Sequence, residues 1–226
     1  MLDRVEIGPL QPGERAPNVV LDAISREGKI AIDDFRGRKP VLVGLFRGLH
    51  CPFCRRHIAA LSRLGPALSE HGVENLTVVN TPIERARLYF RYHPMPALLA
   101  ASDPERASHR AFGLPSVEFT ENETAWPNKV SMATAMAMKV DLPGELPEPM
   151  NPMAAGAFLD KKDGYERTEV DLQMEATGHG QLVGQFLLDR EGVVRWSFTE
   201  VPDGGRHMFG APTTQELMSA VSRVTN

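Results

Sequence analysis

Cysteine is scarce in this sequence: there are two among 226 residues, Cys51 and Cys54, and they stand three positions apart. The disulfide framework of a small secreted domain needs more cysteines at wider spacing. A bridge between Cys51 and Cys54 would also close so short a loop that it would add little stability. Thiol exchange or metal binding therefore explains the pair better than a structural crosslink does.

Long apolar runs and runs of one charge are also missing. The longest apolar stretch, 41–46, is far too short to cross a bilayer. The first six residues are polar and acidic, where a signal peptide would be basic and then apolar. The net charge is −4 without a polybasic segment, which argues against a nucleic-acid or membrane partner. We expect a cytoplasmic protein with one domain over residues 1–226.

What the sequence does contain is an alternation of strand-like and helix-like segments, which favours an α/β fold. The continuous apolar run 41–46 is typical of a strand buried on both faces. The helix that follows the cysteines should kink at Gly65-Pro66. The expected strands are 19–23, 29–32, 41–46, 76–80, 97–101, 185–188 and 193–198, and the expected helices are about 52–72, 83–92, 103–113 and 213–224.

Between about 115 and 180 the periodic pattern is lost. After Pro115 this stretch contains five further prolines and six of the ten methionines, with one helix-like run at 131–139. Structureless loops of this length are uncommon unless functional, so we interpret the stretch as an insertion or lid. Its methionines 132, 136, 138, 150 and 153 either form an apolar wall over the active site or pack within the insertion. Ordinary packing is the favoured interpretation.

The cysteine pair stands where a buried strand gives way to a helix. The first N–H groups of a helix lack intrahelical partners and the helix dipole is positive there, so Cys51, just before Pro52, should have a lowered pKa. Cys54 follows one turn later, within reach of a mixed disulfide on Cys51. Arg47 and His50 add positive charge, and no acidic residue lies between Asp34 and Glu70.

Several alternatives stay open for these residues. The cysteines could be small core residues, or could bind zinc together with His57 and His50. His50 could form an ion pair with a thiolate or lie exposed in a loop. Arg47 could bind the developing charge of a peroxide oxygen, or could simply be solvated.

Four stretches resemble the thioredoxin-like superfamily, and more closely its alkyl hydroperoxide reductase/thiol-specific antioxidant branch of peroxiredoxin-like proteins. They cover roughly two thirds of the chain and leave the insertion unmatched. No proline lies between Pro152 and Pro202, so the cis-proline of thioredoxins is missing, which favours the peroxiredoxin-like branch. The stretches are Gly13-Glu14-Arg15-Ala16-Pro17 with the next strand, 41–61 with Arg47-Gly48-Leu49-His50-Cys51-Pro52-Phe53-Cys54, 78–114 with Asn80-Thr81-Pro82 and Ser102-Asp103-Pro104, and 186–196.

The resemblance implies a thioredoxin-like fold: a central mixed β-sheet flanked by helices, with a long insertion before the C-terminal hairpin. It also implies a cofactor-free, metal-free oxidoreductase in which Cys51 and Cys54 are catalytic and Arg47, His50 and Pro52 support the thiolate. The partners would be a small peroxide or disulfide, an external thiol or thioredoxin-type reductant and, as a possible assembly, a homodimer. Peroxiredoxins usually carry Thr three residues before the attacking Cys. If Cys51-Pro52 is aligned with the family's Cys-Pro step, Cys51 is the attacking residue and Gly48 stands at the position of that Thr. If Cys54 is instead aligned with the attacking Cys, Cys51 stands at the position of the Thr. A glutaredoxin- or thioredoxin-type disulfide oxidoreductase and a non-catalytic redox sensor are the alternatives.

Overall fold

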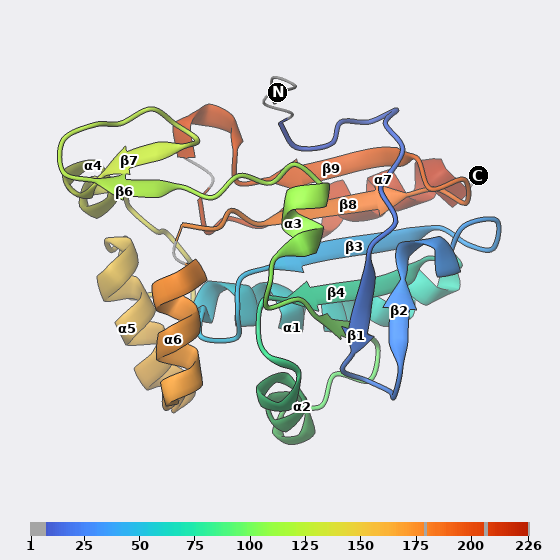
Figure 1. The fold of residues 1–226 in the computed structure, drawn as a ribbon, viewed down its shortest axis with the longest axis horizontal. Helices are drawn as coiled ribbons and strands as arrows, with labels where there is room; N and C mark the ends of the chain where they lie inside the picture. Colours follow the sequence, from blue (N-terminus) through green and yellow to red (C-terminus); the bar gives the residue numbers. More distant parts are fainter. Residues whose placement is uncertain (1–7, 179, 206–207, 226) are drawn as a thin grey trace, which may run out of the picture.

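The main sheet of the computed structural model, which describes residues 8–178, 180–205 and 208–225, has seven strands. They are β1 (Val20–Ala23), β2 (Lys29–Ala31), β3 (Val41–Phe46), β4 (Glu74–Val79), β5 (Leu99–Ser102), β8 (Gly184–Leu188) and β9 (Val194–Thr199). Their order is β2-β1-β5-β4-β3-β8-β9 (Figure 1). The neighbours β3, β4 and β5 are parallel, and the other pairings are antiparallel. The predicted mixed sheet is confirmed.

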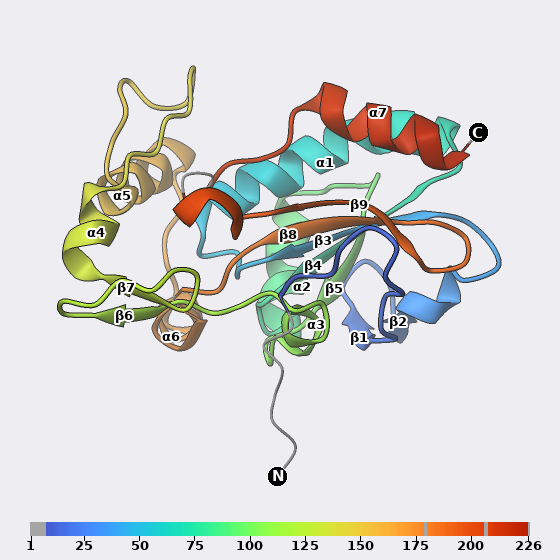
Figure 2. The ribbon, with the colours of Figure 1, turned by 90° about the horizontal axis from the view of Figure 1, so that it is seen from above.

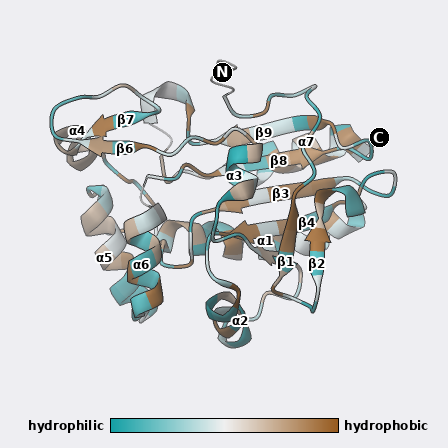
Figure 3. Cartoon of the chain, in the orientation of Figure 1, coloured by the Kyte–Doolittle hydropathy of each residue, from teal (hydrophilic) through white to brown (hydrophobic). Residues whose placement is uncertain are grey.

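Strand β3 lies inside this sheet, between β4 and β8, and all six of its residues are buried. Its side chains alternate between two apolar clusters: Leu42 and Phe46 belong to one, and Val41, Val43 and Leu45 to the other. This two-sided burial is why the strand is continuously apolar rather than alternating. The colouring of β3 in Figure 3 is accordingly hydrophobic along the strand.

Helices cover both faces of the sheet. Helices α1 (Pro52–Glu70) and α7 (Thr214–Thr225) lie side by side on one face, and the short α3 (Ala107–Ala111) lies on the other (Figure 2). Helix α2 (Ile83–Tyr92) buries Ala86 and Tyr89 in the same apolar cluster as α1. Short 3-10 turns occur at Ile32–Asp34 and Pro202–Gly205. Within the described ranges, no helix is long and apolar enough to cross a bilayer.

The predicted insertion is far more ordered than its sequence pattern indicated. It contains a small parallel sheet of β6 (Glu118–Thr120) and β7 (Lys129–Ser131), followed by α4 (Met132–Ala137), α5 (Pro152–Asp163) and α6 (Glu169–Gly178). Figure 1 places these elements at one end of the main sheet, toward which β3 points and where α1 begins. The insertion therefore lies next to the cysteine pair.

One predicted helix start differs from the structure. Helix α1 is a single element through Pro66, where the proline removes one backbone hydrogen bond without ending the helix, and the kink there stays a prediction. Helix α3 begins at Ala107 rather than at 103, because Asp103 stays outside it. The Asp103 carboxylate accepts hydrogen bonds from the backbone N–H groups of Ala107 and Ser108, at 3.0 and 2.8 Å. It thus satisfies donors that a helix start leaves unpaired.

Candidate active site

Cys51 is the N-cap residue of α1, with extended backbone angles (φ −83°, ψ 109°), and Pro52 takes the first helical position. Proline is favoured there because its missing N–H would have no intrahelical partner. The Sγ atom of Cys51 accepts a hydrogen bond from the backbone N–H of Cys54 at 3.2 Å. The Cys51 sulfur thus accepts the backbone hydrogen bond that a serine or aspartate oxygen accepts at other helix N-caps.

The two thiols have opposite electrostatic environments. Burial raises the pKa of Cys51, but the hydrogen bonds from Cys54 and the charge of Arg47 outweigh burial and lower the pKa to about 7. Burial and the adjacent Cys51 thiolate raise the pKa of Cys54 well above its ordinary value. At neutral pH Cys51 is therefore substantially ionised, whereas Cys54 holds its proton. Since the thiolate is the nucleophile, this division favours Cys51 as the attacking residue.

Arg47 follows β3 and is held by a carboxylate far away in the sequence. Its guanidinium forms two hydrogen bonds to Glu200, at 3.3 and 2.5 Å, and Nη1 lies 4.0 Å from Sγ of Cys54. The guanidinium also lies over the Phe209 ring, 4.9 Å from its centroid. Arg47 is therefore a fixed cation beside the thiols rather than a solvated side chain.

Glu200 was not singled out in the sequence, yet it organises this side of the site. Its side chain is 1% exposed and accepts 2.8 Å hydrogen bonds from the backbone N–H groups of Val183 and Phe209, besides the two from Arg47. One carboxylate thus connects β3, the start of β8 and the segment before α7. No local sequence pattern could have identified Glu200 as the partner of Arg47, which lies 153 positions away in the chain.

His50 is buried beside the site rather than exposed in a loop. The side chain is buried, its Nδ1 has no hydrogen-bond partner, and burial lowers its pKa to about 4. Burial and the positive charge of Arg47 lower the pKa of His57 to about 4 as well. These lowered pKa values favour neutral imidazoles at pH 7, so desolvation disfavours an ion pair between His50 and the Cys51 thiolate.

The positive surroundings predicted for the cysteines are also largely neutralised. Arg55 donates to Asp160 at 2.7 Å and to Asp163 at 3.0 Å, and Arg56 pairs with Asp163 at 2.9 Å. Both carboxylates belong to α5 in the insertion, so the absence of acids between Asp34 and Glu70 did not predict the charge in space. Arg55 also donates to the carbonyl of Leu49 at 3.0 Å. It thereby connects α5 to the loop that leads into Cys51.

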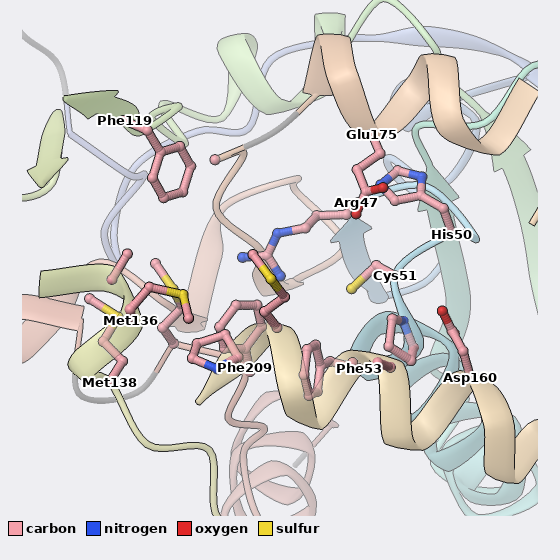
Figure 4. Close-up of a pocket in the computed structure, with 18 of the residues that line it drawn as sticks. Arg47, His50, Cys51, Phe53, Phe119, Met136, Met138, Asp160, Glu175 and Phe209 are labelled. Atoms are coloured by element: carbon pink, nitrogen blue, oxygen red, sulfur yellow. The ribbon is translucent and has the colours of Figure 1, made fainter. Parts of the chain in front are cut away.

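A cavity of about 630 Å³ opens on the Cys51 side of α1. The core contributes Arg47, His50, Cys51, Pro52 and Phe53, so this cavity brings together all the predicted site residues except Cys54. Cys51 itself is 6% exposed, and that exposure faces the cavity (Figure 4).

The insertion supplies the other wall of the cavity, including Met132, Met136, Met138 and Met153. Of the five methionines considered in the sequence, Met150 packs against the main apolar cluster and Met138 against the small apolar cluster of the insertion, so ordinary packing holds for these two. Met132, Met136 and Met153 line the cavity and remain exposed, so it does not hold for them. Methionine suits such a wall because its unbranched side chain adapts to varied shapes.

The zinc alternative requires Cys51, Cys54, His57 and His50 to gather round one point. Among the described residues, no group of three or more His, Cys, Asp or Glu side chains is placed to hold a metal ion. Both cysteines are free thiols. The arrangement of the site is that of a reduced dithiol.

This chain belongs to the AhpC/TSA family, whose model matches residues 12–136. That range covers β1 to β5 and the cysteine pair, and ends at the first helix of the insertion. No curated protein sequence matches the chain significantly.

Solved peroxiredoxin structures share the fold of the whole chain. The peroxidoxin BcpB of Mycobacterium tuberculosis is 10% identical with a TM-score of 0.56, covering 95% of this chain and 98% of its own. The reduced 2-Cys peroxiredoxin of Plasmodium vivax is 14% identical with a TM-score of 0.56, covering 95% and 81%. A peroxiredoxin-like protein from Aquifex aeolicus is 13% identical with a TM-score of 0.56, covering 96% and 90%. At these identities the likeness establishes the thioredoxin-like fold alone.

Proposed function

We propose that this protein is a thiol-dependent peroxidase in which Cys51 attacks the peroxide and Cys54 resolves the product. The observation that carries the proposal is the position of Cys51: its sulfur caps α1, faces a cavity and has a pKa near 7. The raised pKa of Cys54 supports the assignment of the second role to that residue.

In the first step, the Cys51 thiolate attacks the terminal oxygen of a hydroperoxide. A sulfur–oxygen bond forms, the oxygen–oxygen bond breaks, and the leaving alkoxide takes a proton to become an alcohol. The sulfur is oxidised by two electrons and becomes a sulfenic acid, while the peroxide is reduced. The fixed guanidinium of Arg47 is close enough to stabilise the negative charge that moves onto oxygen.

In the second step, the sulfur of Cys54 attacks the sulfenic acid on Cys51. A disulfide forms and water leaves, taking up the proton that Cys54 gives away. The high pKa of Cys54 keeps that thiol protonated until this step. An external dithiol then reduces the disulfide, by attack through a mixed disulfide, and restores both thiols.

Reduction of a disulfide substrate by the same two cysteines is the second candidate. The hydrogen bond between the two cysteine side chains favours it, because the Cys54 thiol could equally resolve a mixed disulfide on Cys51. Burial favours a small substrate over a protein disulfide, since Cys51 is 6% exposed and Cys54 is 1% exposed. We therefore place peroxide reduction first.

The test compares wild type, Cys51→Ser and Cys54→Ser in peroxide consumption with dithiothreitol as reductant, and in reduction of insulin disulfides. Wild type should consume peroxide and Cys51→Ser should not. Cys54→Ser should accumulate a sulfenic acid that dimedone traps at residue 51, the one cysteine left in that variant. Insulin reduction without peroxide consumption would establish the second candidate instead. Equal behaviour of all three proteins in both assays would exclude both.

A further inference from the structure

Both sulfurs of the site are poorly accessible to a large reactant. Cys51 is 6% exposed and Cys54 is 1% exposed. A small peroxide can reach Cys51 through the cavity, but a disulfide is reduced by a thiolate that attacks one of its sulfur atoms. A bulky dithiol must therefore come into contact with the pair, and one wall of the cavity has to move to admit it.

Helix α5 is the fixed wall of the cavity. Its residues Ala155 and Leu159 are 0% exposed and belong to the main apolar cluster, together with residues of α1. Gly156 lies against Pro52, since a Cβ at Gly156 would be 3.8 Å from Cγ of the proline. Moving α5 would expose apolar surface that is now fully buried, which costs free energy. This helix therefore stays in place while the core is intact.

Helix α6 is attached in a different way. None of its described side chains belongs to an apolar cluster, and its Val170 and Leu172 are 36% and 47% exposed. Among the described side chains of this helix, Asp171 alone is buried. Segments with few buried apolar contacts are the ones that open locally in a folded protein. Helix α6 is therefore the wall that can move.

One ion pair connects α6 to helix α2. Asp171 accepts hydrogen bonds from Nε and Nη2 of Arg85, at 3.3 and 2.8 Å. Among the residues that the structure describes, no other ion pair joins α6 to the chain outside the insertion. The two side chains are 2% and 13% exposed. Removing either partner leaves the other charge desolvated and unpaired, which destabilises the closed position of the helix.

Helix α6 closes one side of the cavity. Glu175 on α6 lines it beside Arg167, which donates to Glu175 at 2.5 Å. In Figure 4, Glu175 and Asp160 of α5 lie on opposite sides of Cys51. The side chains of Arg167 and Glu175 are 27% and 38% exposed, and ion pairs in contact with solvent contribute little. Displacing α6 thus opens the cavity beside Cys51 while α5 stays in place.

The chain is fixed on both sides of α6. Before the helix, the guanidinium carbon of Arg55 lies 3.9 Å from the centroid of the Tyr165 ring, which packs against the main apolar cluster. After the helix, the Gly180 carbonyl accepts a hydrogen bond from the N–H of Val117 at 2.8 Å. Gly180 has a φ of 85°, a conformation that glycine adopts without strain. The part that moves is therefore bounded by Tyr165 and Gly180.

We propose that α6 is a lid over the Cys51 cavity, that the Arg85–Asp171 ion pair holds it closed, and that its opening admits the external dithiol to the oxidised site. The lid follows from the contacts of α6 alone, whereas its role in reduction rests on the proposed function. Peroxide enters the closed cavity, so only the reductive half of the cycle requires opening. The ion pair thereby controls how large a reductant the site accepts.

The lid is tested on the reduced protein by comparing a small and a bulky alkylating reagent at Cys51. Arg85→Gln removes the ion pair but keeps the bond from the Thr168 N–H to Asp171 that caps α6. Its Cys51 should react with a maleimide attached to polyethylene glycol at least tenfold faster than wild type, while the rate with iodoacetamide changes less than twofold. Glu169→Gln removes an exposed charge from the same helix and should behave like wild type.

Two further measurements separate a released lid from a damaged fold. Asp171→Asn should give the same gain as Arg85→Gln, and the double variant should gain little more, because both changes remove one interaction. Gains that multiply in the double variant would overturn the role of the ion pair. Amide hydrogen exchange in Arg85→Gln should speed up within 166–178 and stay slow in α5. Faster exchange in α5 as well would overturn the lid.

Reduction of the disulfide tests the role of the lid in the cycle. After oxidation with diamide, Arg85→Gln should be reduced by a purified thioredoxin at least fivefold faster than wild type, with the rate for dithiothreitol unchanged. Equal thioredoxin rates would overturn that role. Faster alkylation by the bulky reagent in a protein without peroxidase activity would support the lid and refute the proposed function. Peroxidase activity with equal alkylation rates in wild type, Arg85→Gln and Asp171→Asn would overturn the lid and leave the proposed function standing.

Discussion

Replacing Glu200 by Gln should make Cys51 a stronger acid. Glu200 shares the Arg47 guanidinium with the thiols, and its negative charge raises the pKa of Cys51. In the Gln variant that charge is gone and the full positive charge of Arg47 acts on the sulfur. The substitution is close to isosteric, so it changes the electrostatics more than the packing.

The size of the effect follows from the geometry. The bonds from Glu200 Oε1 to Arg47 Nη1 and from there to Cys54 Sγ, 3.3 and 4.0 Å, put the carboxylate within about 7 Å of that sulfur. Two unit charges at about 7 Å interact by about 2.4 kcal/mol at an effective dielectric constant of about 20. One pKa unit corresponds to about 1.4 kcal/mol. That distance is to Cys54, and Glu200 is the smallest of the causes that act on Cys51, so we expect the pKa of Cys51 to fall from about 7 by less than about one unit.

The variant should also be less stable. The two oxygens of Glu200 accept the backbone N–H groups of Val183 and Phe209 separately, but a glutamine side chain has one acceptor oxygen. One buried donor loses its partner, which should cost about 1–3 kcal/mol of unfolding free energy.

The assay is the pH dependence of iodoacetamide alkylation, with the labelled cysteine identified by peptide mass spectrometry. Glu191→Gln, at an exposed turn, is the control and should leave the profile of Cys51 unchanged. A pKa of Cys51 that stays the same or rises in Glu200→Gln would refute the account of Arg47 as a cation shared between carboxylate and thiolate.

Three further predictions concern stability, each measured by urea unfolding. Gly65→Ala should lose about 1–3 kcal/mol, because its Cβ would lie 2.3 Å from that of Ala97, whereas Gly156→Ala, whose Cβ meets nothing closer than 3.8 Å, should be neutral or slightly stabilising. His109 is fully buried and burial lowers its pKa to about 3, so the unfolded chain takes up its proton first as the pH falls below 6.5. Lowering the pH to about 5 should therefore cost about 2 kcal/mol that His109→Leu does not lose; equal losses would contradict this. The lowered pKa of Cys51 should add about 1.5–2 kcal/mol as the pH rises from about 7 to about 9, and Cys51→Ser should show no such gain.

The parts of the molecule that were predictable from the sequence are those encoded by neighbouring residues. Strand β3 follows from six consecutive apolar residues, and the cap at Cys51 follows from its place between that strand and Pro52. Helix α5 could have been found too, since Asn151 caps it through its side chain and Gly164 ends it in the left-handed region (φ 61°). Its apolar residues are spread around the helix, so periodicity gave no signal.

The parts that were missed depend on contacts between distant residues. Glu200 reaches Arg47 across 153 positions, and Asp160 reaches Arg55 across 105. Charge that looks unbalanced along the chain is balanced in space, which is why Arg47 is fixed, whereas His50 is neutral because it is buried. The electrostatics of the site could be derived only once the fold had brought these carboxylates to it.

The most direct measurement of the central claim is the alkylation rate of each cysteine in the reduced wild-type protein as a function of pH. The account predicts that Cys51 reacts first, with a midpoint near pH 7. It predicts that Cys54 stays unreacted until well above pH 9. Faster reaction at Cys54, or a common midpoint close to the roughly 8.5 of a free cysteine, would contradict the claim that the start of α1 holds an ionised sulfur.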